Sequence, residues 1–85
     1  MKNFNDLNFT PHHVNGVASR ILFENGYGAS VIKTEWSYGG KDGLYELAVL
    51  YDNEIHYDNP VANGDVIGYL TEEDVNKLLE EIQKL

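Results

Sequence analysis

Cysteine is absent from this sequence, and its absence excludes disulfide bonds, thiolate metal sites and a cysteine nucleophile. Long apolar runs are also absent, since no stretch approaches the roughly 18 apolar residues that a membrane-spanning helix needs. The first residues, MKNFNDLNF, show none of the apolar core that marks a signal peptide. We therefore expect a cytoplasmic protein that does not bind membranes.

Basic residues are scarce. The chain has 6 Lys and Arg against 14 Asp and Glu, which gives a formal net charge of -8. The stretch from residue 42 to residue 76 has no Lys or Arg and contains these acidic residues: Asp42, Glu46, Asp52, Glu54, Asp58, Asp65, Glu72, Glu73 and Asp74. An acidic surface repels phosphate backbones, so we expect no direct binding of nucleic acid. It can attract a basic surface on another protein, although solubility alone would also account for it.

Motifs for catalysis and cofactor binding are missing as well. Gly39 and Gly40 precede Lys41, but they do not join a strand to a helix at the spacing of a phosphate-binding loop. Turn geometry explains these glycines, and a weak anion site formed by their backbone N–H groups is the alternative. Ser30, Ser37 and the histidines show no nucleophile motif. We predict a protein without enzymatic activity and without a cofactor.

Potential metal ligands alternate along one short stretch: Asp52, Glu54, His56 and Asp58. On an extended segment they share a face, and His12 or His13 could complete a site for a divalent ion. Ligands along one flat strand do not converge on a point, however, so a solvated strand edge is the better interpretation. We predict no metal site.

A chain of 85 residues forms one domain, with room for one sheet layer and one helix layer. Residues 1–16 show no clean hydrophobic period, so we expect an irregular entry segment. Phe4, Leu7 and Phe9 supply its apolar anchors, and a short helix or strand fits within residues 3–9.

Residues 17–24 and 27–36 are predicted to form two strands of a hairpin. The intervening Asn25-Gly26 favours a two-residue type I′ turn, in which both residues have positive φ. This turn sets three residue pairs: Phe23 with Gly28, Ile21 with Ser30, and Ser19 with Ile32.

The predicted pairing places apolar side chains together on one face, which we expect to be the core face: Val17, Ile21, Phe23, Ile32 and Trp36. Arg20, Glu24 and Lys33 then lie on the other face, toward water.

Residues 37–43, SYGGKDG, are predicted to form a turn before a third strand at residues 44–52. Both faces of this strand are partly apolar, so we expect it to be central in the sheet. Residues 55–57 add a short fourth strand, which ends before Pro60 and the Asn63-Gly64 turn.

The start of the helix is the clearest local signal. Thr71 is the expected N-cap and Asp74 the N3 residue of a capping box, with Leu70 and Val75 as the hydrophobic staple. Apolar residues then follow at helical spacing: Val75, Leu78, Leu79, Ile82 and Leu85. We expect a helix over residues 71–85 to cover the predicted core face of the sheet.

These elements predict an α+β fold, an antiparallel β-meander of three to four strands with a C-terminal helix packed on one face. Residues 1–85 form a single domain, with the entry segment at 1–16, the sheet at 17–57 and the helix at 71–85.

Three stretches carry a resemblance: NGYGASVI at 25–32, SYGGKDGLYELAVL at 37–50 and DVIGYLTEEDV at 65–75. They resemble a family of small uncharacterised proteins encoded by bacteriophages and prophages, chiefly of Gram-positive bacteria. The resemblance covers most of residues 16–85 and implies a phage accessory gene product. It implies no known activity and supplies no catalytic or binding residues.

Six tyrosines and one tryptophan are many for this length, and they lie beside predicted turns and strands. Aromatic side chains can fill a small core, but those set among carboxylates suit an interface with an acidic rim. We predict that such an interface uses the following residues to bind a partner: Tyr38, Lys41, Asp42, Glu46, Asp52, Glu54 and Asp58.

The expected function is therefore non-enzymatic protein binding by an acidic phage accessory protein. Its partner would be a host protein with a basic surface, such as a nucleic-acid-binding or defence protein whose groove it occupies and thereby inhibits. One alternative is a small-ligand binder, a homodimer that traps an anionic nucleotide between glycine turns. The other alternative is a minor structural protein of the phage particle.

Overall fold

The computed structural model describes residues 1–62 and 64–85, so the predicted turn residue Asn63 lies outside the described residues. It contains two short 3₁₀ helices, η1 (Phe4–Asp6) and η2 (Gly40–Asp42), and one α-helix, α1 (Glu72–Gln83). The strands are β1 (Thr10–Pro11), β2 (Val17–Leu22), β3 (Tyr27–Lys33), β4 (Tyr45–Tyr51), β5 (Glu54–Ile55) and β6 (Ile67–Leu70). No helix within the described residues has the length and apolar character needed to cross a membrane.

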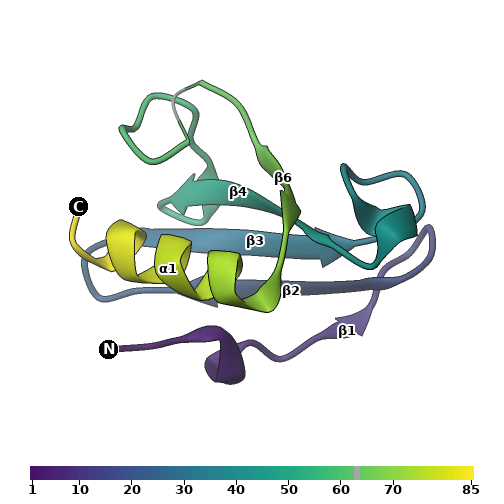
Figure 1. The fold of residues 1–85 in the computed structure, drawn as a ribbon. Coiled ribbons are helices and arrows are strands. Elements are labelled where there is room, and N and C mark those ends of the chain that lie inside the picture. Colours follow the sequence, from purple (N-terminus) through teal and green to yellow (C-terminus); the bar gives the residue numbers. More distant parts are fainter. Residues whose placement is uncertain (63) are drawn as a thin grey trace.

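The strands form one antiparallel sheet in the order β1-β2-β3-β4-β5, and β6 also pairs with β4. β3 occupies one edge of β4, so β5 and β6 share the other edge, at its two ends. Figure 1 shows α1 lying across one face of this sheet. The α+β class is confirmed, but the described residues form six strands where three to four were expected. The short strands β1 and β6 were not predicted. β1 contains Pro11 and β6 contains Gly68, and proline and glycine weaken the sequence signal of a strand.

The β2–β3 hairpin differs from the prediction by one residue. Phe23 N–H donates to Tyr27 O at 2.8 Å and Gly26 N–H donates to Phe23 O at 3.2 Å, which closes a loop of residues 24–26. Gly26 is left-handed with φ 89°, as predicted, but Asn25 is not. A left-handed glycine at the last position is typical of three-residue hairpin loops, so the predicted type I′ turn is wrong.

The longer loop shifts the register of the whole hairpin. The observed pairs are Leu22 with Gly28, Ile21 with Ala29, and Ser19 with Val31. Because side chains alternate between faces, a shift of one residue turns every β3 side chain to the opposite face. Ala29 and Val31 are therefore buried beside Ile21 on the core face. The predicted register had placed Ile32 on this face instead.

Three expectations that depended on the predicted register are wrong. Ile32 pairs with Glu46 and lies on the sheet face opposite α1. Trp36 lies beyond the end of β3 and is exposed. Lys33, expected toward water, instead shares the core face with Tyr45, and its Nζ lies 4.9 Å from the centroid of the Tyr45 ring.

Asn25 joins the hairpin loop to the end of α1. Its Oδ1 accepts a hydrogen bond from Tyr27 N–H at 3.0 Å, and its Nδ2 donates to Ile82 O at 3.0 Å. Ile82 O, in the last turn of α1, also accepts from Leu85 N–H at 3.2 Å, so Asn25 supplies an additional donor to this carbonyl. Asn25 was predicted to adopt positive φ in the turn. It instead stabilises the loop through the hydrogen bonds of its side chain.

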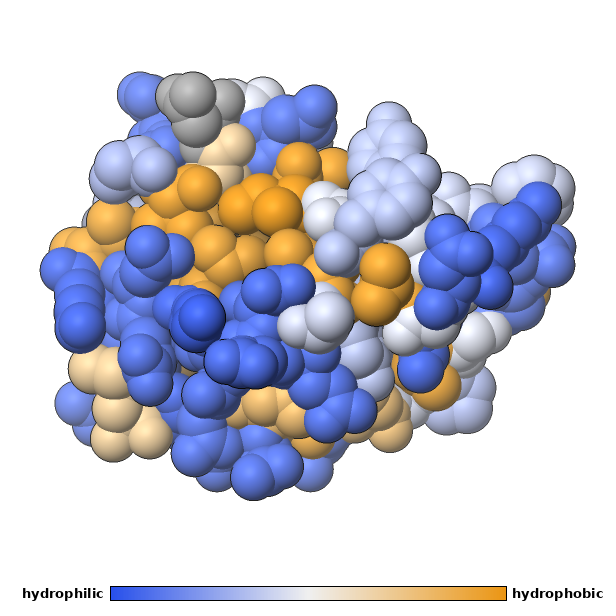
Figure 2. Space-filling view, viewed as in Figure 1, coloured by the Kyte–Doolittle hydropathy of each residue, from blue (hydrophilic) through white to orange (hydrophobic). Residues whose placement is uncertain are grey.

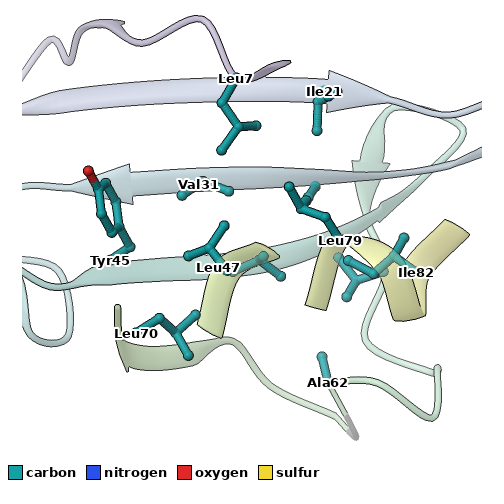
Figure 3. Close-up of a cluster of buried hydrophobic side chains, with 12 residues drawn as sticks. Leu7, Ile21, Val31, Tyr45, Leu47, Ala62, Leu70, Leu79 and Ile82 are labelled. Carbon is teal, nitrogen blue, oxygen red and sulfur yellow. The ribbon is translucent and has the colours of Figure 1, made fainter. Parts of the chain in front are cut away.

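The core lies between the sheet and α1, where Figure 3 shows side chains from both layers converging. Side chains with no exposed surface come from both layers: Ala29, Val31 and Leu47 from the sheet, and Val75, Leu79 and Ile82 from α1. Each of the larger ones contributes roughly 1.5–3 kcal/mol by its burial. The predicted apolar stripe of α1 is thus confirmed for Val75, Leu79 and Ile82, and Leu78 is partly buried against the core, whereas Leu85 is exposed beyond the helix.

The entry segment contains η1 and β1, and its aromatic residues extend the core. Phe4, Phe9 and Tyr45 form a cluster with ring centroids 5.5–5.9 Å apart. Phe4 N–H also donates to Asn76 Oδ1 of α1 at 2.8 Å. The predicted anchors Phe4 and Phe9 are therefore confirmed as packed residues.

Both ends of the chain lie on the same side of the molecule (Figure 1). Lys2 N–H donates to Gln83 Oε1 at 2.9 Å, and Gln83 Nε2 donates to Lys2 O at 2.7 Å. These two bonds fix the entry segment beside the last turn of α1.

The predicted start of the helix is confirmed. Thr71 Oγ1 accepts from Asp74 N–H at 3.1 Å, and Asp74 Oδ2 accepts from Thr71 N–H at 3.0 Å. Leu70 and Val75 are both buried, as a hydrophobic staple requires. Hydrogen bonds from the backbone and side chain of Thr71 hold the pKa of Asp74 below its ordinary value of 3.8.

Replacement of Asn25 distinguishes the observed loop from a type I′ turn. We expect Asn25→Gly and Asn25→Ala each to lower the free energy of unfolding by about 1–2 kcal/mol, because both remove the side-chain bonds to Tyr27 and Ile82. Urea unfolding monitored by circular dichroism measures the change. A type I′ turn would predict the opposite for glycine, since glycine accepts positive φ at no cost.

The capping box predicts a pH-dependent contribution to stability. Thr71→Ala should lower the free energy of unfolding by about 1 kcal/mol at pH 7, whereas Thr71→Ser should preserve it. Asp74→Asn should also destabilise the protein at pH 7. Because the pKa of Asp74 is depressed in the folded state, its contribution is present above the ordinary pKa and is lost as the pH falls through the depressed value.

Urea titrations of Asp74→Asn between pH 7 and pH 2 test this linkage, with Glu80→Gln in the middle of α1 as the matched loss of one charge. A stability difference between wild type and Asp74→Asn that stays constant over this range would contradict it.

Candidate functional site

The segment after β3 begins with a turn that Thr34 and Ser37 hold together. Thr34 N–H donates to Ser37 Oγ at 2.9 Å, and Ser37 N–H donates to Thr34 Oγ1 at 3.0 Å. Ser37 Oγ also donates to Thr34 O at 2.9 Å. Thr34 is buried, and these bonds satisfy its polar groups. The following residues therefore start from a fixed position.

Glycines then bring the backbone into close contact. Gly40 passes so close to Thr34 O that a side chain at position 40 would collide with it. Gly39 has φ 89°, a left-handed conformation that favours glycine. The 3₁₀ helix η2 follows directly and carries Lys41 and Asp42 on the exposed surface.

The glycine turn packs against β6. Tyr69 N–H donates to Tyr38 O at 3.1 Å. Any Cβ on Gly68 would collide with the Cβ of Tyr38, and a Cβ on Gly39 would lie 2.9 Å from the Cα of Tyr69. The two glycines therefore allow the two tyrosine-bearing segments to lie side by side.

Tyr69 adopts an unusual backbone conformation. Its φ is 57°, in the left-handed region, which costs a non-glycine residue roughly 1–2 kcal/mol. Its side chain is 63% exposed, so burial of the ring does not offset this cost. Tyr69 lies where the register between β4 and β6 is irregular, since Tyr45 pairs with Leu70 and Leu47 with Ile67, and such a bulge accounts for the local change of backbone conformation.

Three large aromatic side chains are exposed at this end of the sheet, and we call them the aromatic patch: Trp36 (72%), Tyr38 (57%) and Tyr69 (63%). The Nζ of Lys41 lies 5.9 Å from the centroid of the Trp36 ring, within the range of a cation–π contact. The turn and β6 thus present aromatic surface to solvent on a rigid support, which makes the patch the leading candidate for a binding surface.

Glu46 of β4 borders the aromatic patch. Its burial raises its pKa above the ordinary value of 4.5, while a hydrogen bond from Tyr38 N–H lowers it and the charge of Asp65 raises it further. The net shift is upward, so the ionised carboxylate is less favourable here than in water.

The predicted partner-binding residues occupy two separate places. Tyr38, Lys41, Asp42 and Glu46 lie at the glycine turn or beside it. Asp52 and Glu54 lie at the hairpin between β4 and β5. Asp58 follows β5.

These two groups are far apart, since Asp52, directly after β4, follows Glu46 by six positions along an extended chain. At about 3.3 Å per residue this is roughly 20 Å. The predicted set therefore cannot act as one compact surface, and the aromatic rings favour the group at the glycine turn.

The alternating acidic residues do not gather into a metal site. Asp52 and Asn53 form a tight left-handed turn with φ 53° and 64°. The His56 ring packs against Tyr27 and Tyr51, with centroid distances of 6.2 and 5.6 Å. Among the described residues, no group of three or more His, Cys, Asp or Glu side chains could hold a metal ion.

A second hollow lies between α1 and β6. This groove has a volume of about 460 Å³. Ile67, Leu70 and Leu78 line it together with charged residues of α1 and its C-terminal end: Asp74, Lys77, Glu80, Glu81 and Lys84. Figure 2 shows apolar surface above α1, bordered by hydrophilic side chains.

A larger hollow of about 660 Å³ lies where the entry segment, the hairpin loop and the end of α1 meet. Its lining includes Lys2, Asn25 and Gln83. These residues bond to one another or to Ile82 O, so their polar groups already have structural partners. We therefore assign this hollow no binding function.

Sequence reasoning missed two parts of the site and misplaced a third. Trp36 was assigned to the core through the wrong hairpin register, and Tyr69 was assigned no function. Gly68 did carry a usable signal, since a glycine inside a strand often marks close approach of another backbone. Nothing in the sequence pattern indicates the left-handed conformation of Tyr69.

Comparison of Tyr69→Gly with Tyr69→Ala isolates the backbone strain, because both variants lack the ring. We expect the glycine variant to be more stable than the alanine variant by about 1 kcal/mol, since only alanine retains the left-handed penalty. In an ordinary strand, alanine would be the more stable of the two. Urea unfolding of both proteins measures the sign, and a more stable alanine variant would show that Tyr69 is not strained.

No family model matches the chain, and neither the curated proteins nor the solved structures include a significant match.

Proposed function

We propose that this protein is a phage or prophage accessory protein that acts by binding another protein, without catalysis. The observation that carries the proposal is the aromatic patch, in which Trp36, Tyr38 and Tyr69 are each more than half exposed on a rigid support. Tryptophan and tyrosine dominate the binding energy of protein interfaces, because their large rings become fully desolvated on contact. The phage origin is supported by the resemblance of the three sequence motifs alone.

The partner is a host protein with a basic surface. Asp42, Glu46 and Asp65 give the patch an acidic border, and the net charge of -8 adds a long-range attraction for cations. Such a field accelerates encounter with a basic surface and disfavours acidic partners. A groove that normally holds a nucleic acid has the required charge, so occupation of this groove would inhibit a host nucleic-acid-binding or defence protein.

Exposed tyrosines elsewhere on the chain allow a controlled test. The tagged protein is used to capture proteins from an extract of the bacterial host, and the affinity of the retained protein is then measured by calorimetry. We expect Trp36→Ser to weaken binding about 30-fold or more, the effect of removing an interface hot spot. Tyr57→Ser, which removes an aromatic side chain that is exposed outside the patch, should leave affinity within about twofold.

Two triple variants test the acidic border at equal net charge. Asp42→Asn, Glu46→Gln and Asp65→Asn together should slow association and flatten its salt dependence. Asp52→Asn, Glu54→Gln and Asp58→Asn also remove three charges but should have a smaller effect, because they lie away from the patch.

Equal effects of the two triple variants, or wild-type affinity in Trp36→Ser, would contradict binding through the patch. Retention of no host protein above the level of an unrelated acidic protein would contradict the function itself.

A further inference from the structure

Two Asn-Gly dipeptides lie in hairpin loops that the structure describes: Asn15-Gly16 between β1 and β2, and Asn25-Gly26 between β2 and β3. In both loops the asparagine is half-buried and the glycine is exposed. Both glycines are also left-handed, with φ 72° at Gly16 and 89° at Gly26. Exposure and glycine conformation are therefore alike in the two loops, and the hydrogen bonds of the asparagine side chains distinguish them.

An Asn-Gly dipeptide is prone to deamidation, because glycine has no side chain to hinder attack by its own backbone nitrogen. This nitrogen loses its proton to water or hydroxide and forms a bond to Cγ of the asparagine. The bond between Cγ and Nδ2 then breaks, and Nδ2 takes up a proton and leaves as ammonia. Water opens the resulting succinimide at either carbonyl, which yields aspartate or isoaspartate. Water is thus the co-reactant, and the reaction consumes no oxidant or reductant.

At Asn25 the reacting groups are all held in hydrogen bonds. Nδ2 donates to Ile82 O at 3.0 Å, and Oδ1 accepts from Tyr27 N–H at 3.0 Å. Gly26 N–H donates to Phe23 O at 3.2 Å, which retains the proton that must leave. The side chain of Asn25 can turn its Cγ toward Gly26 only after its bond to Ile82 has broken. The contact with α1 therefore opposes deamidation.

Asn15 is held by fewer bonds. In the described part of the chain its side chain makes one hydrogen bond, in which Oδ1 accepts from Glu35 N–H at 2.9 Å. The nitrogen that leaves during deamidation takes no part in this bond. Asn15 therefore provides a matched site, at which the same dipeptide reacts without a contact to the helix.

We propose that Asn25 is a deamidation site that the folded protein keeps closed and that opens when the end of α1 separates from the hairpin loop. The product does not restore the closed state. Nδ2 donates to Ile82 O at 3.0 Å and to Leu85 O at 3.5 Å, whereas the carboxylate of aspartate can only accept. Isoaspartate also lengthens the loop backbone by one carbon. Deamidation therefore makes the separation of the helix end permanent.

Water reaches this contact in the folded protein. Asn25 and Gln83 line the hollow of about 660 Å³ where the hairpin loop and the end of α1 meet. The supply of water therefore does not limit the reaction. Its rate follows the fraction of molecules in which the contact is open, as for other reactions that depend on local unfolding.

Mass spectrometry measures the two sites separately, because trypsin places Asn15 in peptide 3–20 and Asn25 in peptide 21–33. The intact protein is incubated at mildly alkaline pH, folded or in urea, before a short digestion. We expect Asn25 to deamidate at least about tenfold more slowly than Asn15 in the folded protein. In urea the two rates should agree within about threefold, since both asparagines precede glycine.

Two matched core substitutions identify the opening that exposes Asn25. Ile82→Val and Ile21→Val each shorten a buried isoleucine by one carbon, but Ile82 lies in the last turn of α1 and Ile21 lies in β2. We expect Ile82→Val to accelerate deamidation of Asn25 about three- to tenfold and Ile21→Val to leave it unchanged. Circular dichroism shows that each variant is folded.

Asn25→Asp reproduces the aspartate product and tests its effect on α1. The amides in the last turn of α1 should exchange with solvent at least about tenfold faster than in the wild type, whereas Asn15→Asp should leave them unchanged. Three results would overturn the proposal: equal deamidation of Asn15 and Asn25 in the folded protein, equal acceleration in the two valine variants, or wild-type exchange in Asn25→Asp.

Discussion

The pairing of β4 on both of its edges is the constraint on which the rest of the structure depends. β3 follows one edge along its length, while β5 and β6 divide the other. The two faces of β4 are also both used, since Leu47 and Val49 face α1 and Leu50 is buried on the opposite side. A strand that is buried on both faces needs apolar residues at successive positions, and residues 45–50 are largely apolar in this way. Glu46 is the exception to this pattern, and it is the β4 residue that borders the aromatic patch.

Local signals predicted the parts of the fold that depend on local chemistry. The capping box of Thr71 and Asp74 involves four consecutive residues, so its hydrogen bonds could be inferred from their identities. The central position of β4 followed from its two apolar faces. The prediction of the hairpin register was wrong by one residue, and the observed loop includes a contact with a distant part of the chain, the bond from Asn25 to Ile82. No pattern within residues 17–36 reports that contact, and a single-residue error there moved Ile32 and Trp36 out of the expected core.

The binding surface was predicted in part for a related reason. The sequence shows tyrosines among carboxylates, and this composition was enough to predict a binding surface at the turn. Tyr38 and Lys41 of this turn are exposed in the structure. The proximity of Tyr38 and Tyr69 could not be inferred, because Tyr69 belongs to β6, a strand that the sequence did not predict. The acidic residues near the β4–β5 hairpin looked equivalent in sequence but lie at the other end of the strand. The sequence order of charges is thus a poor guide to their grouping in an antiparallel sheet.

The bonds between Lys2 and Gln83 have a consequence for how the chain folds. Their partners are 81 positions apart, and the Asn25 contact spans 57. Contacts between distant positions form only after long loops close, and loop closure costs conformational entropy. Folding is therefore expected to be slow for a domain this small, in about milliseconds to seconds. Synthesis adds a further delay, because α1 leaves the ribosome after all the strands. Until then the apolar face of the sheet has no cover, and a nascent chain in this state is a natural substrate for chaperones.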